Sequence, residues 1–207
     1  MQKRLFYPFI LLAATVLTGC SSAPNPPNSN NICTVFKQEP RWYWDSIDVY
    51  NRWGVPVSVQ MAIIQKESDF RSDARPPRSK LLGFIPWARP TTAYGYAQAV
   101  DDTWEQYKQA TGNHDASRDD FTDADNFIGW YAHQAQQQLG ISPHNAHDLY
   151  LAYWAGLSGY AKGNYRNTPW ILGAADYVQS TADRYRNQLM YCYKDIPKPS
   201  VWNLWLH

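Results

Sequence analysis

The chain has 207 residues, a formal net charge of +1 and 18% charged residues, so it carries neither a strong positive nor a strong negative excess. This balance argues against nucleic acid as a partner, because binding to phosphate backbones depends on clustered Lys and Arg. The length suits one domain with a substantial hydrophobic core.

The first nineteen residues have the features of a secretory signal. Lys3 and Arg4 form a short positive region, and an apolar run then leads to Leu-Thr-Gly-Cys at residues 17–20. The run is too short for a membrane-spanning helix. Its ending resembles the lipobox of bacterial lipoproteins, which implies cleavage before Cys20 and acylation of that cysteine. The alternative is an ordinary signal peptide in which the cysteine occurs by chance.

A lipid anchor would place the chain in the bacterial cell envelope. Because Ser21 follows Cys20 in place of Asp, resemblance to Gram-negative lipoproteins predicts attachment to the periplasmic face of the outer membrane. Removal of residues 1–19 leaves 17 of the 19 basic residues against 18 acidic ones, a net charge of −1. Membrane binding is therefore expected through the anchor and not through basic side chains.

Residues 20–40 are predicted to form the acylated cysteine and a flexible tether. Within them, residues 21–31 contain only Ser, Ala, Pro and Asn, a composition that favours extended, solvated chain. The folded domain is predicted to cover residues 41–195, followed by a tail over residues 196–207. The tail contains Trp202, Leu204, Trp205 and Leu206 and is expected to pack back onto the domain or to meet a partner.

Apolar residues recur at helical spacing throughout the predicted domain, and no stretch shows the sustained alternation of a strand. The pattern predicts an all-α domain of six or seven helices. Gly54 and Gly140 are expected to end helices, and Pro56 to begin one. The helical patterns run over Tyr43–Tyr50, Val57–Ile64, 101–110, Ala124–Leu139, Leu149–Gly156 and Ile171–Leu189. The stretch Arg71–Thr92 holds four prolines and is predicted to be a loop insertion or a small hairpin.

Two cysteines remain after Cys20 is assigned to the anchor. An exported protein meets an oxidising compartment, so Cys33 and Cys192 are predicted to form a disulfide. Closing so long a loop stabilises the fold by roughly 4–5 kcal/mol in the chain-entropy model. Cys and His residues show no metal-ligand spacing, so neither a metal nor a cofactor is predicted.

Glu67 has an unusual position for a charged residue. It follows Ile63 and Ile64 by four and three positions, which places it on or beside the apolar face of a helix, near its C-terminal end. Burial and the negative pole of the helix both raise a carboxyl pKa, here from about 4.3 towards roughly 6–7. That range suits a general acid at neutral pH. The alternative is a surface glutamate, exposed or paired with a neighbour such as Lys66 or Arg71.

Three short motifs follow one another along the chain. They are Glu-Ser at residues 67–68, Gly-Tyr-Ala-Gln at 95–98 and Ala-Tyr-Trp-Ala-Gly at 152–156. In this order they resemble the Glu-Ser, Gly-Leu-Met-Gln and Ala-Tyr-Asn-Ala-Gly motifs of the soluble-lytic-transglycosylase type of lysozyme-like domain. The resemblance covers about residues 41–191.

This resemblance implies a lysozyme-like helical fold and peptidoglycan glycan strands as the partner. It also implies cleavage of the MurNAc–GlcNAc bond to 1,6-anhydro-MurNAc ends, with Glu67 acting first as acid and then as base and without a second carboxylate. Ser68 is then expected to orient or hold the site, and the Tyr177 hydroxyl to support Glu67. The residues expected to line or flank the groove are Gly95, Tyr96, Ala97, Gln98 and Tyr153.

The chain also departs from the family pattern. Tyr96, Ala97 and Trp154 replace Leu, Met and Asn, and about ten extra residues separate Glu67 from Gln98. The extra segment is basic and either forms a lip over the groove, facing stem-peptide carboxylates, or is a solvated loop. Its basic and aromatic members include Arg75, Arg78, Lys80 and Trp87.

Two other functions stay open at this point. A hydrolase of the goose-type-lysozyme kind needs a carboxylate that positions water opposite Glu67. A non-catalytic glycan-binding lipoprotein is favoured by the altered motifs, but has no need of a costly glutamate on an apolar face. Asp123 and Asp125 are interpreted as early-helix charges and not as catalysts. A high aromatic content, with ten Trp and fifteen Tyr, fits either an aromatic core or a groove that stacks on sugars.

Overall fold

The structure is a computed structural model that describes residues 28–81, 85–86 and 89–198. The predicted signal segment 1–19, the acylated Cys20 and the tail from residue 199 onward lie outside the described residues. Trp87 of the basic segment lies outside them as well. The predictions for these parts therefore stay predictions.

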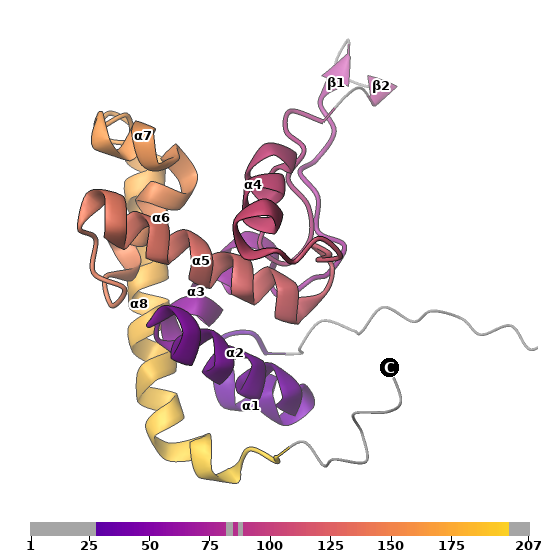
Figure 1. The fold of residues 1–207 in the computed structure, drawn as a ribbon, viewed down its shortest axis with the longest axis vertical. Coiled ribbons are helices and arrows are strands. Elements are labelled where there is room, and N and C mark those ends of the chain that lie inside the picture. Colours follow the sequence, from indigo (N-terminus) through magenta and orange to yellow (C-terminus); the bar gives the residue numbers. More distant parts are fainter. Residues whose placement is uncertain (1–27, 82–84, 87–88, 199–207) are drawn as a thin grey trace, which may run out of the picture.

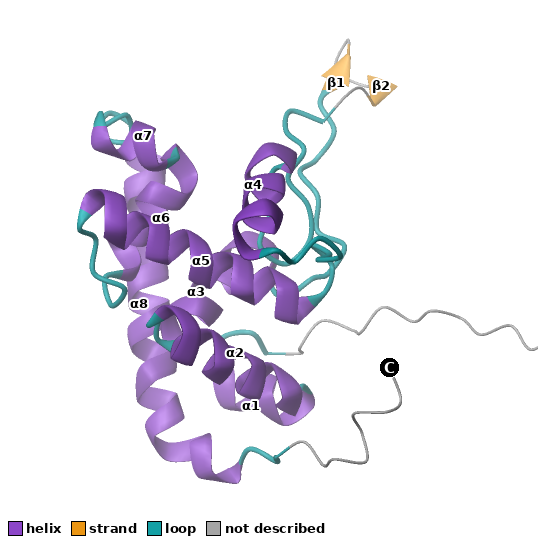
Figure 2. Cartoon of the chain, in the orientation of Figure 1, coloured by secondary structure: helices purple, strands orange, loops and turns teal. Residues whose placement is uncertain are grey.

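Helices make up the regular secondary structure of the described residues apart from one small hairpin and an isolated bridge between Tyr94 and Ala99, which confirms the all-α fold class (Figures 1 and 2). The predicted hairpin is formed by β1 (Lys80–Leu81) and β2 (Ile85–Pro86), paired antiparallel. The helices are α1 (Ile32–Gln38), α2 (Pro40–Trp53), α3 (Val57–Ser68), α4 (Asp101–Thr111), α5 (Phe121–Leu139), α6 (Ala146–Ala155), α7 (Leu157–Ala161) and α8 (Pro169–Cys192), followed by the 3-10 turn η1 (Tyr193–Asp195).

Local signals explain where these helices begin and end. Gly54 and Gly140 follow α2 and α5 in the left-handed conformation, where glycine has no side chain to strain. The side chains of Asp120 and Asn145 accept backbone N–H groups at the start of α5 and α6. Pro40 and Pro169 occupy the first turn of α2 and α8, where the missing N–H is no loss.

Helix α3 forms the centre of the core. Its residues from Val57 to Ile64 are all buried, so it shows almost no polar face. It packs against α8, α2, α5 and α6, while α2 lies along α5 and α6 lies along α8. Figure 1 shows the long α8 running behind the other helices from α7 down to α1. A side chain at the end of α3 is therefore surrounded by protein on several sides.

The folded domain begins before the predicted boundary at residue 41. Helix α1 falls within the predicted tether, and Ile32, Val35 and Phe36 on it are fully buried. The polar composition of the tether ends at Asn31, whose side chain caps α1 through the N–H groups of Cys33 and Thr34. Three apolar residues in seven are enough to bury one side of so short a helix, so the predicted tether is too long at its C-terminal end.

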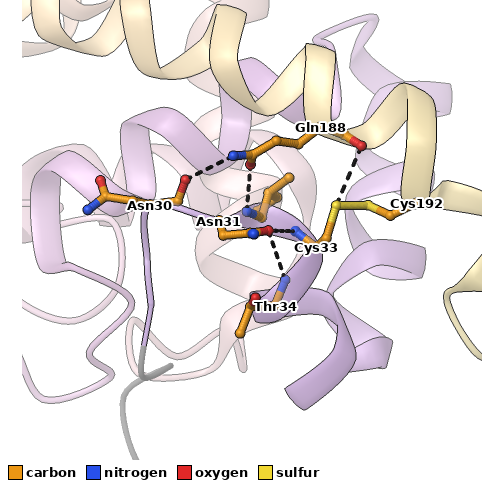
Figure 3. Close-up of a disulfide and its surroundings, with 7 residues drawn as sticks. Asn30, Asn31, Cys33, Thr34, Gln188 and Cys192 are labelled. Carbon is orange, nitrogen blue, oxygen red and sulfur yellow. Dashed lines mark hydrogen bonds between the residues drawn. A yellow bond between two sulfur atoms is a disulfide. The ribbon is translucent and has the colours of Figure 1, made fainter.

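Helix α1 is fixed to the end of α8 by a disulfide between Cys33 and Cys192, as predicted (Figure 3). The side chain of Gln188 reinforces this link. Its Oε1 accepts the Ile32 N–H at 2.9 Å, and its Nε2 donates to the Asn30 carbonyl at 3.2 Å. The two ends of the described domain are thus joined covalently and by hydrogen bonds.

No helix among the described residues is long and apolar enough to cross a membrane.

Loss of the disulfide should lower the melting temperature. The bridge spans 159 positions, for which the chain-entropy model gives about 5 kcal/mol of stabilisation. For a domain of this size that corresponds to a decrease of about 10 °C or more. Differential scanning calorimetry of the native chain with and without reductant measures it. A Cys33→Ser, Cys192→Ser double variant is the control, and it should have the lower melting temperature both with and without reductant. Equal melting temperatures for this variant and the native chain without reductant would reject a stabilising bridge.

Candidate active site

Glu67 occupies the last turn of α3, with its side chain partly buried. Burial raises the pKa of its carboxyl from 4.5 to about 7, because the charged form loses hydration. A hydrogen bond from Tyr150 and the charge of Lys66 both lower the pKa without offsetting this effect. At neutral pH the carboxyl therefore populates both its protonated and its ionised form, as a group that gives and then takes a proton must.

Two tyrosines of α6 form one wall around this carboxyl. The Tyr150 hydroxyl hydrogen-bonds the Glu67 carboxylate, and burial together with that carboxylate raises the Tyr150 pKa far above its ordinary value. Tyr153 lies beside it, partly buried, and desolvation raises its pKa in the same way. Both phenols stay neutral at neutral pH, so Tyr150 acts as a hydrogen-bond donor and does not compete for the proton.

The turn at residues 95–98 is held on the other side of Tyr153. The Tyr153 hydroxyl donates to the Ala97 carbonyl at 2.5 Å. Gln98 donates through Nε2 to the carbonyls of Ala74 and Gly95, at 2.8 and 2.9 Å, which closes the turn. Gly95 is required here, because its φ is +75° and a Cβ atom would lie 1.9 Å from the Arg118 carbonyl oxygen.

Backbone strain concentrates around the same place. Among the described residues the non-glycine positions with positive φ are Asp69 (51°), Phe70 (61°) and Gln98 (49°). Asp69 and Phe70 end α3 directly after Glu67 and Ser68, and Gln98 lies in the turn beside Tyr153. Strained conformations of this kind persist where the surrounding structure over-determines them, and they cluster at functional sites.

Two adjoining hollows lie next to Tyr153. The first, of about 230 Å³, is lined by Gln98, Tyr131, Tyr153 and Trp154 among others. The second, of about 250 Å³, shares Thr103, Tyr131 and Gly156 with the first. It adds the amide side chains of Gln106, Gln134 and Gln138. The two form a groove between α4, α5 and the α6–α7 junction, with aromatic rings and amides for a neutral, hydroxyl-rich ligand.

The structure places Tyr153 next to Glu67 and, with Gln98, on the wall of one hollow, but it turns other predicted groove residues inward. Tyr96 and Ala97 are 5% and 0% exposed. The Tyr96 ring packs on Trp42 and Phe121, and Tyr96 lines a separate hollow on that side and not the groove beside Tyr153. Ala97 contributes its carbonyl to Tyr153, and its methyl group packs in the core.

Ser68 is 4% exposed, and its hydroxyl donates to the Ile64 carbonyl at 3.1 Å. It is therefore placed to hold the end of α3 and not to touch a ligand. Tyr177, expected beside Glu67, instead accepts a hydrogen bond from Gln65 Nε2 at 3.2 Å, and Lys66 Nζ lies 5.7 Å from its ring.

The phenol against Glu67 is that of Tyr150, which the sequence analysis missed. The signal that points to it is helical spacing, because Tyr150 precedes Tyr153 by three residues and so shares its face of α6.

Asp125 is a second carboxyl with a strongly raised pKa. It is fully buried in α5, and desolvation raises its pKa from 3.8 to about 7. Its Oδ2 accepts the Ser46 hydroxyl at 2.7 Å, while Oδ1 has no hydrogen-bond partner among the described residues. Enclosed between α2 and α5, it has no access to the groove, and the residue predicted to be an early-helix charge lies in the core.

Within the described ranges, no group of three or more His, Cys, Asp or Glu side chains is placed to hold a metal ion.

A sequence model of the transglycosylase SLT domain family matches residues 8–192, which is most of the chain. No curated protein matches the chain in sequence. This match includes all three motifs and every helix from α1 to α8. It agrees with the resemblance that the motifs carry and with the helical fold.

Removal of the Tyr150 hydroxyl should raise the Glu67 pKa further. The Tyr150 hydrogen bond favours the ionised carboxylate, so Tyr150→Phe takes away a contribution that lowers the pKa. Titration of the Glu67 side-chain carboxyl by ¹³C NMR in the native and Tyr150→Phe chains measures the shift. Tyr177→Phe is the matched control and should leave the titration unchanged, whereas an effect of Tyr177→Phe alone would place the wrong phenol at the site.

Thermal stability should fall as the pH rises from about 4 to about 8. Glu67 and Asp125 hold their protons more tightly in the folded chain than their ordinary pKa values allow, so the folded state binds more protons than the unfolded one in this window. Stability therefore decreases with increasing pH until both carboxyls have ionised. Melting temperatures at pH 5 and pH 8 should differ less in Asp125→Asn and in Glu67→Gln than in the native chain. A pH dependence that neither substitution changes would contradict both shifts.

Proposed function

The chain belongs to the transglycosylase SLT domain family, and from that premise we propose that it is a peptidoglycan lytic transglycosylase with Glu67 as its catalytic residue. The proposed substrate bond is the β-1,4 link between MurNAc and GlcNAc. The proposed product carries a 1,6-anhydro-MurNAc end, formed without consumption of water.

The observation that carries this proposal is one carboxyl, that of Glu67, which has a pKa of about 7 and interacts with Tyr153, a residue that lines the groove. In its protonated form it donates to the glycosidic oxygen as the bond to C1 of MurNAc breaks. The GlcNAc hydroxyl leaves with that proton. The C6 hydroxyl of MurNAc then bonds to C1, and its proton returns to the Glu67 carboxylate. One carboxyl completes the cycle, and its pKa near neutrality suits both steps.

The surroundings of Glu67 favour this reaction over hydrolysis. Glycoside hydrolysis with inversion or with a covalent intermediate uses two carboxyls that flank the bond. Burial raises the Glu67 pKa. The side chains that shift this pKa among the described residues are those of Tyr150 and Lys66, and neither is acidic. Asp125 is enclosed in the core and is not placed to position water in the groove.

We also propose that the domain is held at the membrane through an acylated Cys20, at the periplasmic face of the outer membrane. Support comes from the sequence alone: the basic start, the apolar run and the Leu-Thr-Gly-Cys ending at residues 17–20. A tether that begins at Ser21 and passes into α1 at Ile32 would separate the groove from the lipid surface.

The proposed reaction is tested by incubating the purified full chain with peptidoglycan and measuring the released muropeptides by mass spectrometry. The native chain should release products lighter than hydrolytic ones by one water. Glu67→Gln should reduce the rate by at least about 100-fold, the lower range for loss of a general acid. The rate of the native chain should fall as the pH rises through about 7, because the protonated form is the one that starts the reaction.

Asp125→Asn is the matched control, since the Asp125 pKa is also raised to about 7 but its carboxyl lies away from the groove. This variant should keep both the products and the decline in rate above pH 7. Products at full hydrolytic mass would assign a lysozyme reaction. Unimpaired cleavage by Glu67→Gln would remove Glu67 from the mechanism.

A further inference from the structure

Two tryptophans are exposed beside the groove. Trp154 of α6 and Trp170 in the first turn of α8 are 41% and 63% exposed. Their ring centroids are 5.3 Å apart, with the ring planes at 89°. Large exposed aromatic side chains that touch one another are uncommon on a protein surface without a binding role.

The position of the pair connects it to the candidate active site. Trp154 lines the first hollow together with Gln98 and Tyr153. Trp170 lies seven residues before Tyr177 on α8, two helical turns apart on the same exposed face. Gly173 lies between them, and a Cβ atom there would meet nothing within 4 Å. The open face of α8 therefore runs from Trp170 to Tyr177, which contacts Gln65 and Lys66 next to Glu67.

The chemistry of this surface fits a sugar ring. Each pyranose of a β-1,4-linked glycan presents C–H groups on its faces and hydroxyls at its rim. An indole face buries the C–H groups, while an amide such as that of Gln106 in the second hollow suits the hydroxyls. Neither tryptophan carries a charge, so the pair favours a neutral ring over a phosphate or a carboxylate.

We propose that Trp154 and Trp170 form a stacking platform that holds one sugar of the glycan strand next to the groove. Trp154 stands where the family motif has Asn, so the platform is a feature of this chain and is not carried over from the family. The inference rests on the proposed function in one respect, since it takes a glycan strand as the ligand. It assigns binding and not chemistry to the pair.

The test measures binding in the absence of cleavage. Full chains carrying Glu67→Gln are sedimented with insoluble peptidoglycan and titrated calorimetrically with a soluble hexamer of β-1,4-linked GlcNAc. Trp170→Ala in this background should weaken binding about tenfold or more, and Trp170→Phe should recover most of it because a phenyl ring still stacks. Tyr191→Ala is the control, because Tyr191 is 84% exposed near the far end of α8, and it should bind as the parent does. Circular dichroism verifies the fold of each variant.

The platform proposal is wrong if Trp170→Ala binds the glycan as well as its Glu67→Gln parent does. It is also wrong if Tyr191→Ala weakens binding as much as Trp170→Ala does. The two proposals fail separately. If the native chain releases anhydro products but Trp170→Ala binds like its parent, the function stands and the platform falls. If no anhydro products form while Trp170→Ala still loses binding and Phe restores it, the platform stands and the catalytic proposal falls. Absence of binding by the parent, together with absence of products, rejects both.

Discussion

The burial of one carboxyl at the C-terminal end of α3 is the constraint on which the site depends. Glu67 is costly there, because dehydration and the negative end of the helix both oppose its charge. The fold offsets the cost only in part, through the hydroxyl of Tyr150 on α6. The remaining cost keeps the pKa near 7. A fully satisfied carboxylate would be more stable but would hold no proton at neutral pH.

The rest of the domain serves to keep that arrangement fixed. Helix α3 is buried along most of its length and packs against α8, whose far end is joined to α1 by the Cys33–Cys192 bridge. On the other side, Tyr153 links α6 to the turn at residues 95–98 through the Ala97 carbonyl, and Gln98 closes that turn. The carboxyl, its phenol and the groove wall thus come from three segments that hydrogen bonds and packing hold in one geometry.

Sequence patterns predict the helices and the position of Glu67, but they do not predict which side chains line the groove. The apolar spacing in α2 to α6 and in α8, the disulfide and the position of Glu67 follow from local rules. The buried side chains of Tyr96 and Ala97 and the Gln65 partner of Tyr177 did not follow from the motifs, because a motif gives the order of residues and not the direction of each side chain. Tyr150 was missed because its role depends on how α6 packs against α3, and α1 because three apolar residues in a polar segment are a weak signal.

Asp125 shows why a raised pKa does not by itself identify a catalytic group. Desolvation raises the pKa of both Asp125 and Glu67 to about 7, yet Asp125 is closed in between α2 and α5 with Ser46 as its partner. Asp125 Oδ1 and Oε1 of buried Gln60, which have no hydrogen-bond partner in the described part of the chain, mark a polar region of the core. Among the described residues, Glu67 alone combines a shifted pKa with strained backbone directly after it, a neutral phenol and contact with Tyr153, which lines the groove. That conjunction, and not the titration, makes Glu67 the candidate for chemistry.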